Sequence, residues 1–507
     1  MHKKKCINLF LLLAFVYKSV AQIPSIKDTV EYARSKAYQK NFIEADKLLT
    51  EYTNNNQNIN ALRLHAQVLY WMNEFSRSIE VFEYTIEAFP EISIVKLDFG
   101  RMLYELNKLP KAELVLNEYL LTDPQNPEAN ILLANINYWK GHLKKAREKL
   151  MIVLIPFPNN PMALAILNEI NLVCTPTLKL NGDFASDSQP LERAGIQAEA
   201  GWYQSWLFSP TFQVNGNRFN STDGNNNSLW MQLGNKIFLG YSGFSLGFKA
   251  GLFNHPAESK SLITTAISVN QKITKSIFIN IGTEKIPYQY TTSSVSIPVM
   301  QQLSSLAIHL NKNDRWLAKA AYELQQFEDN NQIQTAYAWA LAPILHKKYV
   351  KLKGGFVFSY ANSVNNTFIS INPINQIIGT NTPGDLIKGY YKPYFTPNNQ
   401  IINSLLVSFE IQLSKRILIT SNNNIGVFAN ADNPQLLFSK NQGNSYSIIK
   451  SYYKQSYSPM NFQTEIKIKL SDRLALSGLY EYNRLLFYTL SKSSVGLKYA
   501  LINEKKK

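Results

Sequence analysis

Charged side chains stand at every second position of short segments between residues 176 and 501, and these are the residues that could do chemistry. In 462–470, Glu465, Lys467 and Lys469 alternate with apolar residues, which is the two-residue period of a β-strand. Such a strand has one charged face, and a charged face cannot pack in the core of a β-sandwich. The residues that this pattern predicts to face a water-filled interior include Lys236, Lys249, Lys319, Lys351, Lys353, Lys467, Lys469, Glu199, Glu323 and Glu465.

The same pattern predicts an interior that is mixed in charge but net basic. It adds the bases Lys179, Lys272, Arg315 and Lys498 and the acids Asp183, Glu284, Glu410 and Glu481. A net basic interior favours anionic or neutral solutes. Any single lysine is more often a partner in a salt bridge that stiffens the wall than a contact for a solute.

Nucleophiles and bases for catalysis are sparse. The histidines after the first twenty residues lack metal-ligand spacing. The one Gly-x-Ser-x-Gly match, at 243–247, opens a predicted strand and not the strand-to-helix turn of a nucleophile elbow. His309 shares a predicted strand face with Ser305, but four residues of strand are too long for a direct hydrogen bond. We therefore expect no enzyme, no cofactor and no metal, although an outer-membrane enzyme acting on lipid remains an alternative.

The N-terminus is typical of a secretory signal peptide. Three lysines precede an apolar run at 7–16, and Ser19-Val20-Ala21 is a small-x-small cleavage site. The apolar run has about ten residues, whereas a spanning helix needs roughly 20. We expect a signal peptide at 1–21, with a membrane anchor as the alternative. Cys174 would then be the one remaining cysteine, which excludes an intramolecular disulfide.

The composition predicts a secreted protein with a basic surface. The chain has 507 residues and a formal charge of +16, which in a cytosolic protein would suggest nucleic acid. The signal peptide argues against nucleic acid and favours contact with anionic lipid or polymer. Beyond the signal peptide no stretch is apolar enough for a spanning helix, so a membrane could be crossed only by a closed barrel.

Residues 26–175 contain a helical repeat. Small residues at Ala45, Ser78, Ala112 and Ala146 are spaced 33, 34 and 34 residues apart, and thirty-four is the tetratricopeptide period. Large apolar residues stand three positions earlier, other small residues twelve positions earlier, and proline closes the last three units. The segment resembles the tetratricopeptide family, with residues 162–172 as a closing helix.

The tetratricopeptide resemblance implies a scaffold that binds a ligand on the face of its first helices. Each candidate on that face could equally be a solvated or packed residue. The candidates are Arg63, Gln67, Tyr70, Arg101, Tyr104, Asn135 and Tyr138.

Residues 176–501 contain about sixteen alternating segments of about ten residues, the length of a tilted membrane strand. Short links are predicted between every second pair of strands, with longer links at 219–227, 287–301, 362–399 and 431–458. We therefore predict an all-α tetratricopeptide solenoid followed by an all-β transmembrane barrel of about sixteen antiparallel strands and a basic tail at 502–507. A soluble sandwich or propeller is the alternative, and the chain lacks the C-terminal aromatic residue of many outer-membrane proteins.

Repeats and a sixteen-strand barrel in one chain resemble the outer-membrane exporters of cellulose and poly-N-acetylglucosamine. Residues 389–395 (Gly-Tyr-Tyr-Lys-Pro-Tyr-Phe) are similar to a tyrosine-proline segment of those barrels. The resemblance implies an outer-membrane channel whose periplasmic repeats engage a protein partner or nascent polymer while the barrel conducts an anionic or neutral polysaccharide. The alternative is a barrel-anchored scaffold for a surface assembly, without transport.

Overall fold

The computed structural model describes residues 26–501, apart from 240–242, 275, 313–314, 442 and 444. The predicted signal peptide and basic tail lie outside the described residues. The chain forms two compact units that divide after Leu133. The division falls inside the helix Pro127–Trp139, so residues 134–139, the two helices that follow and the strands form the second unit.

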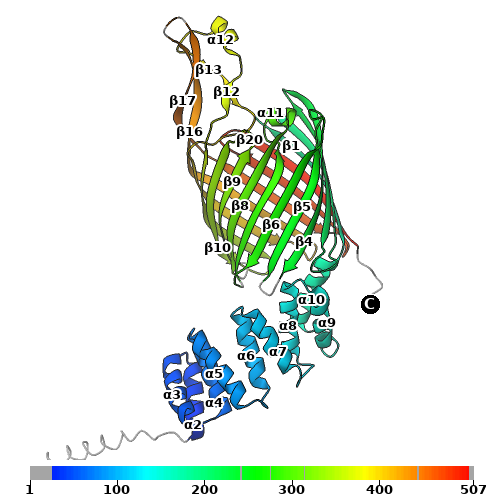
Figure 1. Ribbon diagram of the computed structural model, residues 1–507, viewed down its shortest axis with the longest axis vertical. Helices are drawn as coiled ribbons and strands as arrows, with labels where there is room; N and C mark the ends of the chain where they lie inside the picture. The colour runs from blue at the N-terminus through cyan, green and yellow to red at the C-terminus, as the bar shows by residue number, and fades with distance from the viewer. Residues whose placement is uncertain are drawn as a thin grey trace, which may run out of the picture. The chain divides into compact units, whose positions relative to one another are not determined.

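Antiparallel helix pairs make up the N-terminal part, as the repeat predicts (Figure 1). Small residues occupy the helix contacts because they allow two helices to approach closely: Ala45, Ser78, Ala112 and Ala146 are fully buried. The helices are α2 (Ile26–Tyr38), α3 (Phe42–Asn55), α4 (Ile59–Trp71), α5 (Phe75–Ala88), α6 (Ile94–Glu105), α7 (Leu109–Tyr119), α8 (Pro127–Trp139), α9 (Leu143–Leu154) and the closing helix α10 (Pro161–Cys174).

A left-handed residue follows the first helix of each pair. Lys40, Asn73, Asn107 and Gly141 have φ values of 62°, 65°, 58° and 73°, the conformation that ends a helix and reverses the chain. These positions repeat with the same spacing as the small residues. None of the helices in the described part of the chain is both long and apolar enough to cross a membrane.

Sixteen of the described strands pair antiparallel into one closed barrel, which confirms the predicted fold class. β1 pairs with β2 on one side and with β20 on the other, and this second pairing closes the sheet. The barrel strands are β1 (Thr177–Asp187), β2 (Leu191–Gly201), β3 (Pro210–Ser221), β4 (Gly224–Leu239), β5 (Phe244–Asn254), β6 (Leu262–Lys272), β7 (Ile277–Tyr288), β8 (Val299–Lys312), β9 (Trp316–Phe327), β10 (Gln332–His346), β11 (Val350–Ser363), β15 (Gln400–Gln412), β16 (Ile417–Lys440), β18 (Met460–Lys469), β19 (Leu474–Arg484) and β20 (Thr489–Ala500).

The two faces of the barrel wall differ in polarity. Large apolar side chains such as Phe248 and Ile267, which are 43% and 52% exposed, stand on the outer face. Residues that alternate with them along the strands point to the inner face, where Gln232 of β4 and Thr264 of β6 are buried. An apolar outer surface and a polar interior are the pattern of barrels that stand in lipid.

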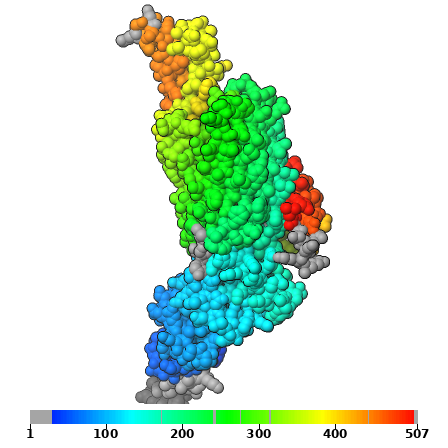
Figure 2. All heavy atoms as spheres, turned by 45° about the vertical axis from the view of Figure 1, so that its right-hand side comes forward, coloured from blue at the N-terminus to red at the C-terminus, as the bar shows by residue number. Residues whose placement is uncertain are grey.

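One of the predicted long links is wrong, and another connects two barrel strands as predicted but is itself a hairpin. Residues 219–227 are mostly strand, because β3 ends at Ser221 and β4 begins at Gly224, whose φ of +113° suits a tight hairpin. Residues 431–458 are not a loop: the second half of β16 pairs with β17 (Tyr446–Tyr457) as a hairpin. Figure 2 shows this orange hairpin and the yellow residues around α12 (Ile374–Thr380) standing beyond the green barrel strands.

Link lengths alternate only in part. We call the barrel end where β1 begins the proximal end and the opposite end the distal end. The proximal link 202–209 is longer than the sequence predicts, whereas the distal link 188–190 is short. Two distal links carry structure of their own: 289–298 contains α11 (Thr292–Ser296), and 364–399 contains α12 and the short strands β12 (Phe368–Ser370), β13 (Leu386–Ile387) and β14 (Gly389–Tyr391).

Candidate functional site: the barrel interior and its two ends

All ten predicted interior residues lie on the inner face of the wall. The strand register shows this directly, because Lys179 stands opposite both Glu199 and Lys498, and Thr420 opposite both Glu410 and Glu465. Ser305, His309, Glu323 and Lys319 likewise pair across β8 and β9. The function of these residues as contacts for a solute stays a prediction.

Three inner-face pairs join neighbouring strands. Lys179 and Glu199 are 2.6 Å apart, Lys351 and Glu410 are 2.7 Å apart, and Arg193 and Asp183 are 2.5 Å apart. These pairs brace the wall, and each contributes little free energy because its side chains are partly exposed.

Further pairs hold Lys319, Lys467 and Lys469. Lys319 donates to the Tyr337 hydroxyl at 2.6 Å, and that hydroxyl donates to Glu323 at 3.0 Å. Lys467 contacts Glu465 of its own strand at 2.9 Å, and Lys469 contacts Asp472 in the following turn at 2.7 Å.

Three predicted lysines differ from this group. In the part of the chain that the structure describes, Lys236, Lys249 and Lys353 have no carboxylate within 4 Å. Glu284 is the acid that interacts electrostatically with Lys249. These lysines therefore keep more of their charge available to a solute than the paired ones do.

Sequence patterns missed two inner-face bases and misplaced one. The register puts Arg193 opposite Ala185 and Phe219, and Lys492 opposite Ala185 and Glu481, all on the inner face. The inward direction of Arg193 and Lys492 follows from the two-residue period of a strand once the strand ends are known. Arg315 lies in the turn before β9 and not in the wall, because its amide donates to the Lys312 carbonyl and closes the turn.

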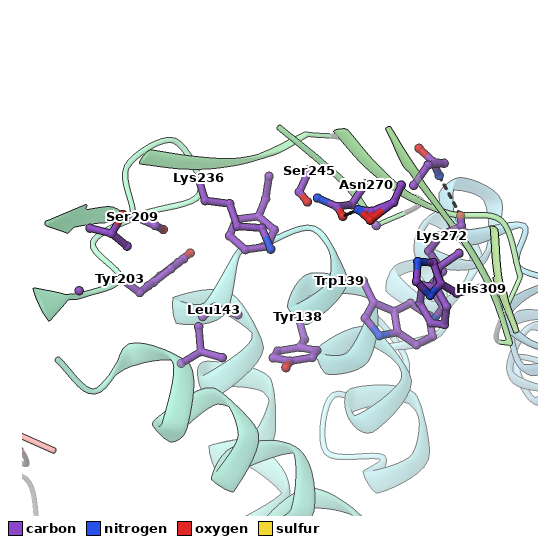
Figure 3. A pocket seen from close by; sticks show the side chains of 18 of the residues that line it. Tyr138, Trp139, Leu143, Tyr203, Ser209, Lys236, Ser245, Asn270, Lys272 and His309 are labelled. Atoms are coloured by element: carbon purple, nitrogen blue, oxygen red, sulfur yellow. Dashed lines mark hydrogen bonds between the residues drawn. The ribbon is translucent and has the colours of Figure 1, made fainter. Parts of the chain in front are cut away.

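The proximal end of the barrel holds a cavity of about 1040 Å³, which we call the proximal chamber (Figure 3). Its wall consists of inner-face residues of the strands, and α8 and α9 supply Tyr138, Trp139 and Leu143. Tyr138, predicted as a residue of the repeat face, therefore lines the chamber. Further lining residues are Lys179, Glu199, Trp202, Tyr203, Lys236, Phe238, Lys272, Phe278, His309, Trp339 and Lys498.

The turn between α8 and α9 fits closely against this end of the barrel. The Tyr203 hydroxyl donates to the Gly141 carbonyl, and burial raises the Tyr203 pKa. The Lys272 ammonium lies 3.4 Å from the centre of the Trp139 ring, a cation–π contact. A Cβ added at Gly141 would stand 2.5 Å from the Phe238 Cβ, so this contact requires glycine.

At the distal end, residues 391–395 cross the mouth. The Tyr394 ring is 1% exposed and stacks on Phe327 at the end of β9, with ring centres 3.5 Å apart. Phe395 donates its amide to the Tyr288 hydroxyl at 3.2 Å and stacks on Phe487 between β19 and β20 at 4.7 Å.

The anchor points of this crossing lie far apart around the barrel. Two anchors lie at the ends of β7 and β9, and the third lies between β19 and β20. Five strands (β10, β11, β15, β16 and β18) separate β9 from β19 in one direction, and six strands (β1–β6) separate β20 from β7 in the other. Residues 391–395 therefore bridge two walls, and we call them the distal belt.

α11 covers another part of the same mouth. Its Val295 is fully buried against Leu191 and Phe219, and the Val295 carbonyl lies 2.9 Å from His255 Nε2. Thr291 before α11 donates its hydroxyl to the Pro393 carbonyl at 2.5 Å, which ties α11 to the belt. The inner faces of β2 and β3 thus end under this helix.

In the repeats, the predicted face residues lie mainly in ion pairs and packing. Arg63 and Arg101 converge on Asp98, with nitrogen–oxygen distances of 2.5 Å and 3.1 Å, and Arg101 also contacts Glu128. Asp98 and Glu128 were not among the predicted face residues. The Tyr70 ring contacts Phe75, and burial raises the pKa of Tyr104. Gln67 and Asn135 are half-buried.

His309 and Ser305, which share a strand face, line different cavities. His309 lines the proximal chamber, whereas Ser305 lines a second cavity of about 440 Å³. The described residues contain no cluster of three or more histidine, cysteine, aspartate or glutamate side chains that could hold a metal.

Among solved structures, the chain is similar to a bacterial polysaccharide outer membrane secretin, with a TM-score of 0.44 and 8% identity over 65% of this chain and 99% of that chain. MamA from Desulfovibrio magneticus RS-1 matches 29% of this chain and 84% of its own at a TM-score of 0.27 and 18% identity. YrrB, a TPR protein with an unusual peptide-binding site, matches 32% of this chain and 84% of its own, with a TM-score of 0.27 and 16% identity. No protein-family model and no curated protein matches this sequence.

Proposed function

We propose that this chain is an outer-membrane channel that exports a polysaccharide or similar polymer, with its helical repeats on the periplasmic side. Lipid offers no partners to backbone groups, so a closed barrel with an apolar outer face is one of the few folds that can stand in it. Sixteen strands enclose a wider interior than the eight whose side chains fill a small barrel. Such a width suits the passage of an extended polymer chain.

The observation that carries the proposal is the position of the proximal chamber. The last helix pair supplies one side of this cavity, and the barrel strands supply the other. A polymer or partner bound at the repeats would therefore meet the chamber before the rest of the interior. Lys236 and Lys249, which have no carboxylate within 4 Å among the described residues, continue the basic lining along β4 and β5.

We infer from the distal belt that such a channel is closed at rest. A chain moving through the barrel would have to displace Tyr394 and Phe395 from both walls. The belt residues 392–395 themselves lie in the link 364–399, and links are the parts of a barrel that move most readily. We propose that export opens the belt, while the repeats recruit a periplasmic protein or the polymer itself.

The same belt supports a second candidate function. A barrel that never opens would be an anchor, and the repeats would then recruit a periplasmic partner to a surface assembly. In that case no polymer would enter the interior, and the charged inner face would serve only to hydrate and brace the wall.

Flux through liposomes separates these two functions. Purified mature chain is placed in liposomes loaded with fluorescent dextran oligomers of graded size, next to a variant in which residues 364–396 are replaced by a short Gly-Ser linker. A channel predicts release of oligomers from the variant, with an upper size limit, and slower release from the native chain. Retention of every oligomer by both proteins, with the barrel folded, contradicts the channel and supports the anchor.

A further inference from the structure

We propose that the proximal chamber is a binding site for an acidic saccharide, held by Lys236 and Lys272 and by the aromatic side chains of the α8 end. This proposal rests on the proposed function, because it names the chemistry of the polymer that the channel would take. It concerns a site that the residues of α8, of the link 202–209 and of the barrel build together.

The charge of the chamber favours an anion. Its lining contains Lys179, Lys236, Lys272 and Lys498, and the one acid among its lining residues is Glu199, which already pairs with Lys179. Lys236, Lys272 and Lys498 bring three further ammonium groups to the same cavity. A carboxylate entering that space would gain charge-assisted hydrogen bonds without losing an existing ion pair at Lys236.

The positions of these lysines suit a chain-like anion better than a single ion. Lys236 lines both the proximal chamber and the second cavity of about 440 Å³, which also contains Lys249. In the strand register Lys249 stands opposite Gly234, so Lys236 and Lys249 are diagonal neighbours on the inner face. Lys272, Lys236 and Lys249 therefore form a track from the proximal end inward.

Small residues leave room along this track. Gly247, Ala266, Ser268 and Gly282 line the second cavity, where larger side chains would fill the space. The chamber itself, at about 1040 Å³, is at the upper end of the roughly 300–1,000 Å³ typical of ligand sites. A segment of several sugar rings fits these dimensions.

The aromatic lining favours a saccharide over other anions. Figure 3 shows Trp139 beside Lys272 and His309, Tyr138 next to it on the same helix, and Tyr203 on the other side of the chamber near Lys236 and Ser209. The flat, apolar C–H face of a pyranose ring packs on such rings, while its edge presents hydroxyl groups. Ser245 and Asn270 at the chamber wall offer hydroxyl and amide partners for those groups.

The Lys272–Trp139 contact gives the ligand a defined way to bind. An ammonium over an indole ring is worth roughly 0.5–2 kcal/mol depending on its hydration. The ring contact does not by itself exclude a carboxylate, because an ammonium has three donors. Trp139 would thus hold Lys272 in position for the anion.

The experiment measures binding of three hexamers to the full mature chain in detergent by calorimetry: hexagalacturonate, neutral cellohexaose and hexaglutamate. We expect hexagalacturonate to bind at least tenfold more tightly than the other two. Lys236→Gln and Lys272→Gln should each weaken it about tenfold and their combination about a hundredfold. Lys236→Arg, which keeps the charge, should retain binding.

Lys353→Gln is the matched control, because Lys353 is also an inner-face lysine without an ion pair but lines a different cavity of about 240 Å³. It should leave the affinity unchanged. Equal binding of cellohexaose, or lysine variants that bind hexagalacturonate as tightly as the native chain, overturns the anionic site. Tighter binding of hexaglutamate overturns the saccharide and favours an acidic peptide.

Liposome flux of the same preparations separates this proposal from the proposed function. Release of dextran oligomers without hexagalacturonate binding removes the chamber site and leaves the channel. Hexagalacturonate binding in a barrel that releases nothing, even after replacement of 364–396, leaves the chamber site and removes the channel.

Discussion

Tyr394 is the residue whose substitution should test most sharply whether the distal belt closes the barrel. Its hydroxyl donates to both carboxylate oxygens of Asp329, at 2.8 Å and 2.6 Å, and its ring stacks on Phe327 with an interplanar angle of 6°. Burial and the neighbouring Asp329 both raise the Tyr394 pKa, so the hydroxyl keeps its proton at neutral pH. Both interactions exist only while the belt is closed.

The two contacts can be removed separately. Tyr394→Phe keeps the ring and removes the hydroxyl, at a cost of about 1.5 kcal/mol, the low end for a hydrogen bond to a charged group, because Asp329 is exposed. Tyr394→Ala also removes a fully buried ring, at a cost of about 3–5 kcal/mol. The ratio of open to closed belt should therefore rise roughly tenfold in Tyr394→Phe. In Tyr394→Ala it should rise between roughly a hundredfold and a few thousandfold.

Hydrogen–deuterium exchange of residues 389–396 in the full chain measures this ratio, and single-channel open probability measures its consequence. Both should increase in the order native, Tyr394→Phe, Tyr394→Ala. Tyr453→Phe is the control, since Tyr453 is an exposed tyrosine of β17 outside the belt. Faster exchange with unchanged open probability would show that the belt moves but does not close the pore, and unchanged exchange in both variants would refute the belt energetics.

Three further predictions concern the helices and their contact with the barrel. Gly141→Ala should accelerate exchange of residues 139–143, because the new Cβ meets Phe238 at 2.5 Å, whereas Gly384→Ala, also at positive φ but in open space, should have no such effect there. Ala112→Leu should lower the free energy of unfolding of the helical part by about 1–3 kcal/mol in chemical denaturation, because Ala112 is fully buried; Leu114→Ala, at an exposed position of the same helix, should be nearly neutral. Burial lowers the pKa of His65, against the effect of its hydrogen bond to Asp46, so the unfolded chain binds more protons and helical stability should fall as pH drops from about 6.5 towards the folded pKa. Circular dichroism melts should show this loss in the native chain and a weaker one in His65→Gln.

The sequence predicted the parts of this fold that depend on local periodicity. A period of 34 places small residues at helix contacts, and a period of two assigns each strand residue to one face of the wall. Inner-face residues such as Lys236 and Glu465 could therefore be predicted before any strand pairing was known. The hairpin at Ser221–Gly224 was missed because polar Asn-rich residues continue a strand there, where such residues are typical of loops.

The two ends of the barrel could not be predicted because they depend on contacts between distant segments. Tyr394 was recognised as part of a tyrosine-proline segment, yet its partner Phe327 lies 67 residues earlier in the chain and no periodicity connects them. The contact of Trp139 with Lys272 has the same character. Asp98 and Glu128 were missed because their ion pairs join successive repeats. Predicting them requires the angle between one repeat and the next, which no local sequence pattern gives.

Single-channel conductance in planar bilayers tests the central claim most directly. The mature chain and the variant with 364–396 replaced should both insert, and we expect rare openings from the native chain and frequent, large, stepwise conductance from the variant, blocked by hexagalacturonate added at the proximal end. A variant that inserts and folds but stays silent would contradict the account, because an interior that conducts no ions cannot conduct a polymer.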